Sequence, residues 1–221
     1  MTLQQSGGIA AIIEGLTYIF GIVLFLIVLD PSDYEGAMGR LQFMTENSDR
    51  YILGLLVSGF LFSFALVVLV QAMHQRLVSV APNLTTFATA TGYFWAAIVL
   101  TSSMIEVVSI NALTGLYATD PDAALVLQRS VSVVSGGLGG DIELVGAVWT
   151  AIISVIGIKH HIFSRWLNYL GLAVGVAGTL TLLAFFSIFK GNSAFELMTL
   201  IFGLGQIPWF IWLGTCLYRN K

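Results

Sequence analysis

The residues of this chain that could do chemistry are a few acids and one amide set within long apolar runs. Glu14, Glu106 and Glu143 each lie in or at the edge of such a run, and Gln206 lies in the last one. A carboxyl group within a membrane helix is costly, so it usually faces protein or water and raises a question of function. Two close carboxyl groups can share a proton or hold a cation. The chemistry to look for is therefore proton or cation binding.

Glu143 opens the clearest of these patterns. Small and polar residues continue from it at the spacing of one helix face: Glu143, Gly146, Thr150, Ser154 and Gly157. Such a face predicts contact with other helices rather than with lipid. We expect Glu143 to point into the bundle, near a donor such as Gln206, Tyr117 or Ser109, and we expect Asp141 at the water interface. The alternative is that Glu143 is an interfacial carboxylate held by hydrogen bonds for structure alone.

Counting residues suggests how deep each acid lies. At a rise of about 1.5 Å per residue, Glu106 lies about 33 Å from Leu84, and Glu143 lies about 24 Å from Lys159. Both would then be near the same membrane boundary, where they either share a site or are unrelated acids at wet helix ends. Glu14 lies about 22 Å below Leu29, toward the opposite face. Gln206 falls between these depths.

Other kinds of site lack the residues that they need. Cys216 is the only cysteine, and the three histidines, His74, His160 and His161, fall in two different loops. A zinc site needs more ligands at closer spacing, so we expect no metal. No serine–histidine–acid set, cysteine nucleophile or phosphate loop can be assembled. We therefore assign no catalytic residue and no cofactor, and an enzyme is the less favoured reading.

The composition predicts which elements position these residues. The chain is 57% hydrophobic and 10% charged, against about 25% charged in a soluble protein. Six apolar runs follow one another: 8–29, 51–73, 84–110, 141–158, 166–189 and 197–218. Each must be helical, because an open strand would leave backbone groups unpaired in lipid. The sequence predicts an all-α, six-span bundle forming one integral membrane domain over residues 1–221.

The connecting segments predict further features. Asp30-Pro31 ends the first run, since proline cannot donate the next helical hydrogen bond. Asp120-Pro121-Asp122 is a helix start and Gly136-Gly137 a hinge, so an interfacial helix is expected between the third and fourth spans. One side holds Arg76, Lys159, Arg165, Arg219 and Lys221, most of them in short loops, against Arg40, Arg50, Arg129 and Lys190 on the other. This small excess predicts that both termini lie in the cytoplasm. The net charge of −3 argues against a nucleic-acid partner.

Four stretches resemble one known family. They are Gly8–Tyr18 (GIAAIIEGLTY), Gly140–Trp149 (GDIELVGAVW), Arg165–Gly171 (RWLNYLG) and Gly203–Gly214 (GLGQIPWFIWLG). They are similar to a family of bacterial multi-pass membrane proteins known only as a domain of unknown function. The resemblance implies a six-helix protein of the bacterial cytoplasmic membrane and brings no activity with it.

Two hypotheses of function follow. The first is a non-catalytic subunit or small binding module that contacts the lipid bilayer and a membrane-protein partner or a second copy of itself. The alternative is a transporter of a small solute, proton or cation, or a lipid-acting enzyme, that uses Glu106 and Glu143. The alternative predicts a polar cavity open outward between the third, fourth and sixth spans.

Overall fold

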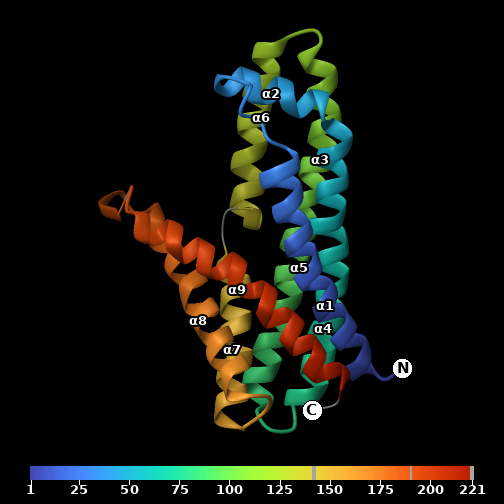
Figure 1. Cartoon of the computed structure of the whole chain (residues 1–221), viewed down its shortest axis with the longest axis vertical. Coiled ribbons are helices and arrows are strands. Elements are labelled where there is room, and N and C mark those ends of the chain that lie inside the picture. The colour runs from blue at the N-terminus through green and yellow to red at the C-terminus, as the bar shows by residue number, and fades with distance from the viewer. Residues whose placement is uncertain (141–142, 190, 220–221) are drawn as a thin grey trace.

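The computed structural model describes residues 1–140, 143–189 and 191–219 of the chain. In that part the regular elements are all helical, and six helices are long and apolar enough to cross a membrane. They form an upright bundle in which α1 begins and α9 ends at the same end (Figure 1). The six-span helical bundle predicted from the sequence is therefore confirmed.

The first two spans form an antiparallel pair. Helix α1 (Leu3–Val23) starts at a Thr2 capping box and continues as the π-helical segment η1 (Leu24–Val28). It ends just before Asp30-Pro31, as the proline predicts. Helix α2 (Gly36–Glu46) lies across the far end (Figure 1). The chain then returns through three successive helical segments: α3 (Ser48–Leu55), η2 (Leu56–Leu61) and α4 (Phe62–Leu77).

The third span is longer than the membrane requires. Helix α5 (Pro82–Tyr117) has 36 residues, which is about 54 Å of helix against a hydrocarbon core of about 30 Å. Helix α6 (Pro121–Ser135) starts where Asp120 accepts a hydrogen bond from the Ala123 N–H at 3.0 Å. It packs back along α5, where Ser102 donates to the Ser135 carbonyl at 3.0 Å. The helix expected after the third span is thus present, but the interfacial position predicted for it is wrong, because it packs lengthwise on α5 (Figure 1).

The fourth span is broken at its glycines. Segment η3 (Gly136–Gly140) contains Gly139 with φ of 111°, a conformation that suits glycine because it has no Cβ. Helix α7 (Leu144–Lys159) follows. The hinge predicted at Gly136-Gly137 lies at Gly139 instead, because Gly136 still has helical backbone angles. Asp141 and its expected interface position lie outside the described residues. On α7, Gly146, Thr150, Ser154 and Gly157 are all buried, so the predicted helix-facing stripe is confirmed.

The last two spans form a separate arm. Helix α8 (Arg165–Leu180) starts at a Ser164 cap and continues into short 3-10 turns η4 (Thr181–Phe185) and η5 (Ser187–Phe189). Helix α9 (Ser193–Tyr218) returns to the starting end. The arm ends well below α2 and leans away from α6, whereas its base packs on α1 and α7 (Figure 1).

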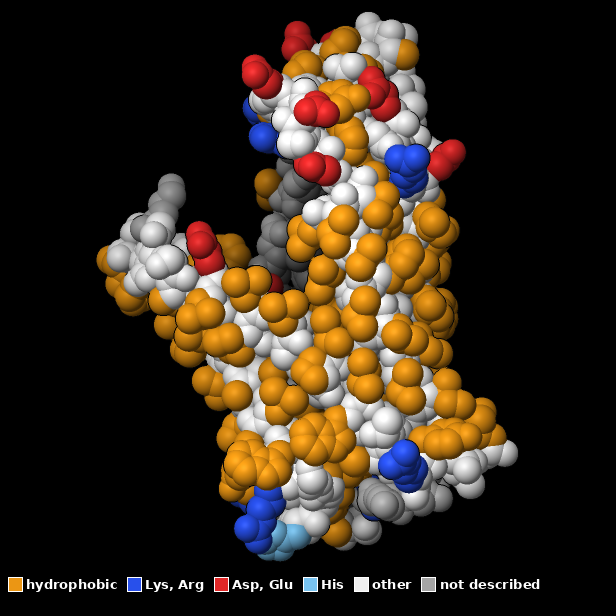
Figure 2. Space-filling model, viewed as in Figure 1, with side chains coloured by type: hydrophobic (Ala, Val, Ile, Leu, Met, Phe, Trp, Pro, Cys, Tyr) orange, Lys and Arg blue, Asp and Glu red, His pale blue; other side chains and the backbone are white. Residues whose placement is uncertain are grey.

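Charged side chains mark the two ends of the bundle. Figure 2 shows acids with some Lys and Arg around α2 at one end, Lys and Arg at the other end, and a largely apolar belt between them. Such a belt is the surface that a bilayer covers. The chain is therefore an integral membrane protein, with α2 and the end of α5 beyond the apolar belt.

Candidate functional site: a cavity between α1 and α9

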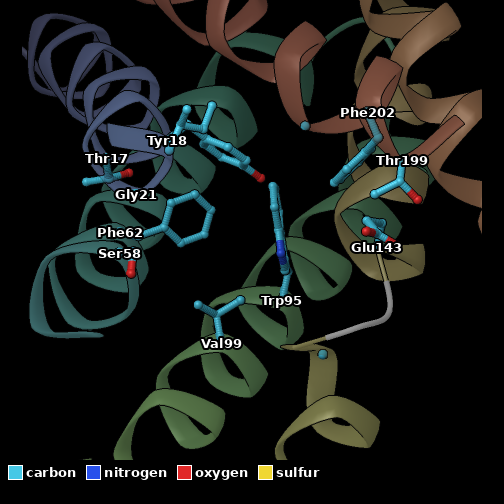
Figure 3. A pocket seen from close by; sticks show the side chains of 13 residues that line it. Thr17, Tyr18, Gly21, Ser58, Phe62, Trp95, Val99, Glu143, Thr199 and Phe202 are labelled. Carbon is cyan, nitrogen blue, oxygen red and sulfur yellow. The ribbon is translucent and has the colours of Figure 1, made fainter. Parts of the chain in front are cut away.

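A cavity of about 350 Å³ lies where α1 and α9 separate. Its walls come from α1, η2, α4, α5, η3 and α9, together with Glu143 at the start of α7. The side chains that shape it include Tyr18, Ser58, Phe62, Trp95, Glu143, Thr199 and Phe202 (Figure 3). The molecular surface is hollowed between the arm and the rest of the bundle at this level (Figure 2). The cavity therefore lies at the side of the bundle.

The glycines of α1 and α9 decide where the cavity begins. A Cβ on Gly8 would lie 2.6 Å from the Tyr218 nitrogen, and one on Gly214 would lie 2.6 Å from the Gly8 carbonyl oxygen. The two backbones thus touch along this lower half. Higher up, Tyr18 on α1 and Phe202 on α9 both line the cavity (Figure 3). Large rings line the space there, and the helices separate.

Aromatic rings form most of the cavity wall. The Tyr18 and Phe62 ring centroids lie 5.8 Å apart, and those of Phe62 and Trp95 lie 5.3 Å apart, both edge to face. Behind them the fully buried Phe210 lies 6.2 Å from Tyr18 and 6.3 Å from Trp95. Such edge-to-face contacts stabilise aromatic clusters beyond the area that they bury. The wall is therefore held in place from behind.

Glu143 is the acid of this site. It is half-buried, and its Oε2 accepts a hydrogen bond from the Thr181 hydroxyl at 3.1 Å. The Tyr18 hydroxyl points into the same cavity from the opposite wall (Figure 3). The prediction that Gln206, Tyr117 or Ser109 would be the donor is wrong. Helix α8 packs closely on α7, and Thr181 at its end therefore reaches the carboxyl group instead.

Gln206 lies below the cavity rather than beside Glu143. It is fully buried, and its Nε2 donates to the Thr150 hydroxyl of α7 at 3.2 Å. Its Oε1 has no hydrogen-bond partner among the described residues. Gln206 thus joins α9 to α7 within the packed half of the bundle.

Glu106 belongs to a different cavity. It lines that cavity with Ser132 of α6, whereas Glu143 lines the first one. Gly139 contacts Ile98, which places the start of α7 level with that turn of α5. From Ile98 to Glu106 is eight residues, or about 12 Å of further rise. The common depth predicted for the two acids is wrong, because α5 continues far beyond the level at which α7 begins.

Glu14 lies one turn below Tyr18 on α1. Its side chain is fully buried, and neither carboxyl oxygen has a hydrogen-bond partner in the part of the chain that the structure describes. Its backbone carbonyl accepts from the Thr17 hydroxyl at 2.8 Å. Tyr18, one turn further along α1, lines the cavity together with Glu143. The sequence separates Glu14 from the other acids, and Tyr18 connects it to one of them.

Trp95 of the cavity wall and Thr181, the donor to Glu143, are among the site residues that the sequence analysis missed. Trp95 lies 13 residues after Pro82, about 20 Å along α5, whereas membrane tryptophans favour the interfaces. A tryptophan in the middle of a span therefore predicts a side chain that packs inside the bundle. Thr181 gave no such signal, since its place depends on how α8 packs.

The histidines contribute nothing to this site. The His74 Nδ1 lies 2.8 Å from the Thr89 hydroxyl, at the end where α4 meets α5. Over the described residues, the histidines, cysteine and acids form no group of three or more that could hold a metal ion.

Comparison with known proteins identifies a family whose function is unknown. The family model for "Domain of unknown function (DUF4386)" matches residues 13–214, nearly the whole chain. No curated protein and no solved structure matches the chain.

Proposed function

The chain belongs to the DUF4386 family of unknown function, and we propose from its cavity that it binds an organic cation within the membrane. The observation that carries this proposal is the wall of Tyr18, Phe62, Trp95 and Phe202 around the carboxyl group of Glu143. Aromatic faces attract cations, most of all where water is excluded. The lining residues in the described part of the chain include this acid and no basic side chain.

The side position of the cavity favours a ligand that dissolves in lipid. Its volume lies at the lower end of the range for small-molecule sites. Two sources carry the required chemistry: a free lipophilic cation, or the quaternary ammonium headgroup of a choline phospholipid. The protein would act as a small binding module, with no catalytic group required.

Binding of tetraphenylphosphonium tests the proposal. We expect purified protein in nanodiscs to bind this cation and not tetraphenylborate, which has the same shape and the opposite charge. Glu143→Gln should weaken binding about tenfold or more, equivalent to about 1.4 kcal/mol. Glu106→Gln is the matched control and should leave affinity unchanged, because Glu106 lines the other cavity. Equal binding of the two ions, or an unaffected Glu143→Gln variant, would sink the proposal.

Competition distinguishes the two sources of the ligand. If a choline phospholipid is the native occupant, added phosphatidylcholine should displace tetraphenylphosphonium and phosphatidylglycerol should not. If the native ligand is a free cation, neither lipid should compete.

A second candidate is a non-catalytic subunit of a membrane assembly. It is favoured by the wide exposure of apolar side chains of α6, with Val126 at 64%, Val133 at 77% and Val134 at 51%. A partner or a second copy would cover them. Native mass spectrometry from lipid nanodiscs should then detect a stable complex, and a monomer in every lipid tested would count against it.

We infer in addition that both termini face the cytoplasm of a bacterial cell. The end of the bundle that holds them carries Arg76, Lys159, Arg165 and Arg219, and cytoplasmic loops favour such residues. A fluorescent protein fused after Lys221 should then be bright in cells, and a phosphatase fused there should be inactive.

A further inference from the structure

Glu14 stands out because nothing around it compensates its charge. It is fully buried, and both carboxyl oxygens lack a hydrogen-bond partner among the described residues. Its neighbour Gly15 packs against Ile207 and Ile211 of α9. An ionised carboxyl group in such surroundings would lose its hydration without replacement. The neutral acid avoids that loss by holding a proton.

The helices packed on α1 supply no countercharge at this level. Helix α1 packs on α4, η2 and α9, and η2 has no titratable residue. The titratable and basic groups of α4 are His74 and Arg76, in its last turn. Those of α9 lie toward its two ends: Glu196, Cys216 and Tyr218, with Arg219 just beyond. The titratable partner of Glu14 is therefore Tyr18, one turn away on its own helix.

Tyr18 connects Glu14 to the cavity. Tyr18 follows Glu14 by one turn of α1, and its hydroxyl points into the cavity that Glu143 also lines (Figure 3). A phenol can donate and accept a hydrogen bond at the same oxygen. Because Tyr18 lies between the buried acid and the cavity, a cation in the cavity can influence Glu14 through it, and the proton that Glu14 loses leaves the protein for water.

We propose that Glu14 holds a proton inside the bundle and releases it when an organic cation fills the neighbouring cavity. This proposal rests on the cation binding proposed above. Before binding, a neutral Glu14 and an ionised Glu143 give the site one negative charge. After binding, two carboxylates and one cation give the same charge. One proton leaves for each cation that enters, so the buried charge stays constant.

Infrared spectroscopy tests the resting proton without any ligand. A protonated carboxyl group gives a C=O stretching band that a carboxylate lacks. We expect wild-type protein and Glu143→Gln in nanodiscs to show a band for one buried protonated carboxyl group, and Glu14→Gln to lose it. A band that persists in Glu14→Gln, or that is missing from the wild type, overturns the proposal.

Proton release tests the exchange. Tetraphenylphosphonium added to lightly buffered wild-type protein should release about one proton per cation bound, and its affinity should rise about tenfold per pH unit. Glu14→Gln should still bind the cation but release no proton, whereas Glu106→Gln should behave as the wild type. Binding by the wild type without proton release overturns the exchange and leaves the proposed function standing. If the wild type binds no cation, both the proposed function and the proton exchange are overturned. The infrared band then shows whether Glu14 is protonated in the absence of ligand.

Discussion

The contact between α1 and α9 has two halves of opposite character. In the lower half, Gly8 and Gly214 bring the two backbones together, so that no room remains for a methyl group. In the upper half, Tyr18 and Phe202 line a cavity. Glycines decide where two membrane helices touch, and aromatic rings decide where they separate. The rigid lower half thus positions the walls of an open upper half.

The largest effect should come from filling the lower half. A Cβ at Gly8 would lie 2.6 Å from the Tyr218 nitrogen and 2.7 Å from the Gly214 carbonyl oxygen, which are backbone atoms that cannot rotate away. We expect Gly8→Ala to lower the free energy of unfolding by about 1–3 kcal/mol, the usual cost of overpacking. Thermal unfolding in a fixed detergent measures it.

Gly203→Ala is the matched control in the upper half. No atom lies within 4 Å of the Cβ that would be added there. Alanine also favours a helix over glycine by roughly 0.5–1 kcal/mol. This variant should be as stable as the wild type or slightly more so. Equal destabilisation by both substitutions would erase the difference between the halves.

The next effect concerns the polar contact just below the cavity. Gln206 donates to the Thr150 hydroxyl at 3.2 Å, and both side chains are fully buried. Thr150→Val leaves the Gln206 amide with no acceptor there, which should cost about 1–3 kcal/mol. Gln206→Leu should cost less, because a helical threonine can donate to the carbonyl four residues earlier.

The double variant sharpens this prediction. Once Gln206 is leucine, Thr150→Val removes a hydroxyl that no longer serves a partner. The double variant should therefore be more stable than Thr150→Val alone, when both are unfolded thermally in the same detergent. Simple addition of the two single effects would mean that the side chains do not interact.

Local sequence signals predicted most of the fold. The proline after Asp30 and the cap at Asp120 each act within a few residues, and both are confirmed. The hinge before α7 lies in the predicted glycine-rich stretch, at Gly139 rather than at Gly136-Gly137. The buried stripe from Gly146 to Gly157 followed from helix periodicity. Such signals can be recognised in the sequence because they depend on neighbouring residues and not on how the helices pack.

The site was less predictable because it depends on the level at which residues of different helices come to lie beside one another. The position of Glu106 relative to Glu143 follows from where α5 and α7 meet, and no residue count reveals that level. Thr181 reaches Glu143 because the glycines of α8 allow close packing on α7, for example Gly175 against Ala151. Tyr18 and Trp95 become neighbours of Glu143 in the same way, across helices distant in sequence.

A smaller effect is expected for Thr181→Val in the upper half. The single hydroxyl proton of Thr181 faces two acceptors, the Gly178 carbonyl at 2.7 Å and Glu143 at 3.1 Å. Because Glu143 is half-buried beside a cavity, water can replace the lost donor. We expect a change of about 0.5 kcal/mol in stability, the low end of what a hydrogen bond contributes. A larger loss on thermal unfolding would mean that the upper half is as tightly packed as the lower.

The smallest effect should lie beyond both halves, at α2. Tyr34 donates to Glu46 at 2.6 Å and Gln42 donates to it at 2.8 Å, all at the surface. These hydrogen bonds, above all the one from Tyr34, hold the pKa of Glu46 below its ordinary value, and the same contact raises the pKa of Tyr34.

The pH dependence of this contact follows from the two pKa shifts. The lowered pKa of Glu46 stabilises the fold at pH values above the ordinary carboxyl pKa, and this stabilisation is lost as the pH falls through the lowered pKa. The raised pKa of Tyr34 stabilises the fold at pH values below the ordinary phenol pKa, and this stabilisation is lost as the pH rises through the raised pKa. The stability difference between wild type and Tyr34→Phe should therefore be a small plateau from about pH 5 to about pH 9, which fades below about pH 4 and above about pH 10. Denaturant unfolding across this range measures it, and a difference independent of pH would show that the tyrosine acts by packing alone.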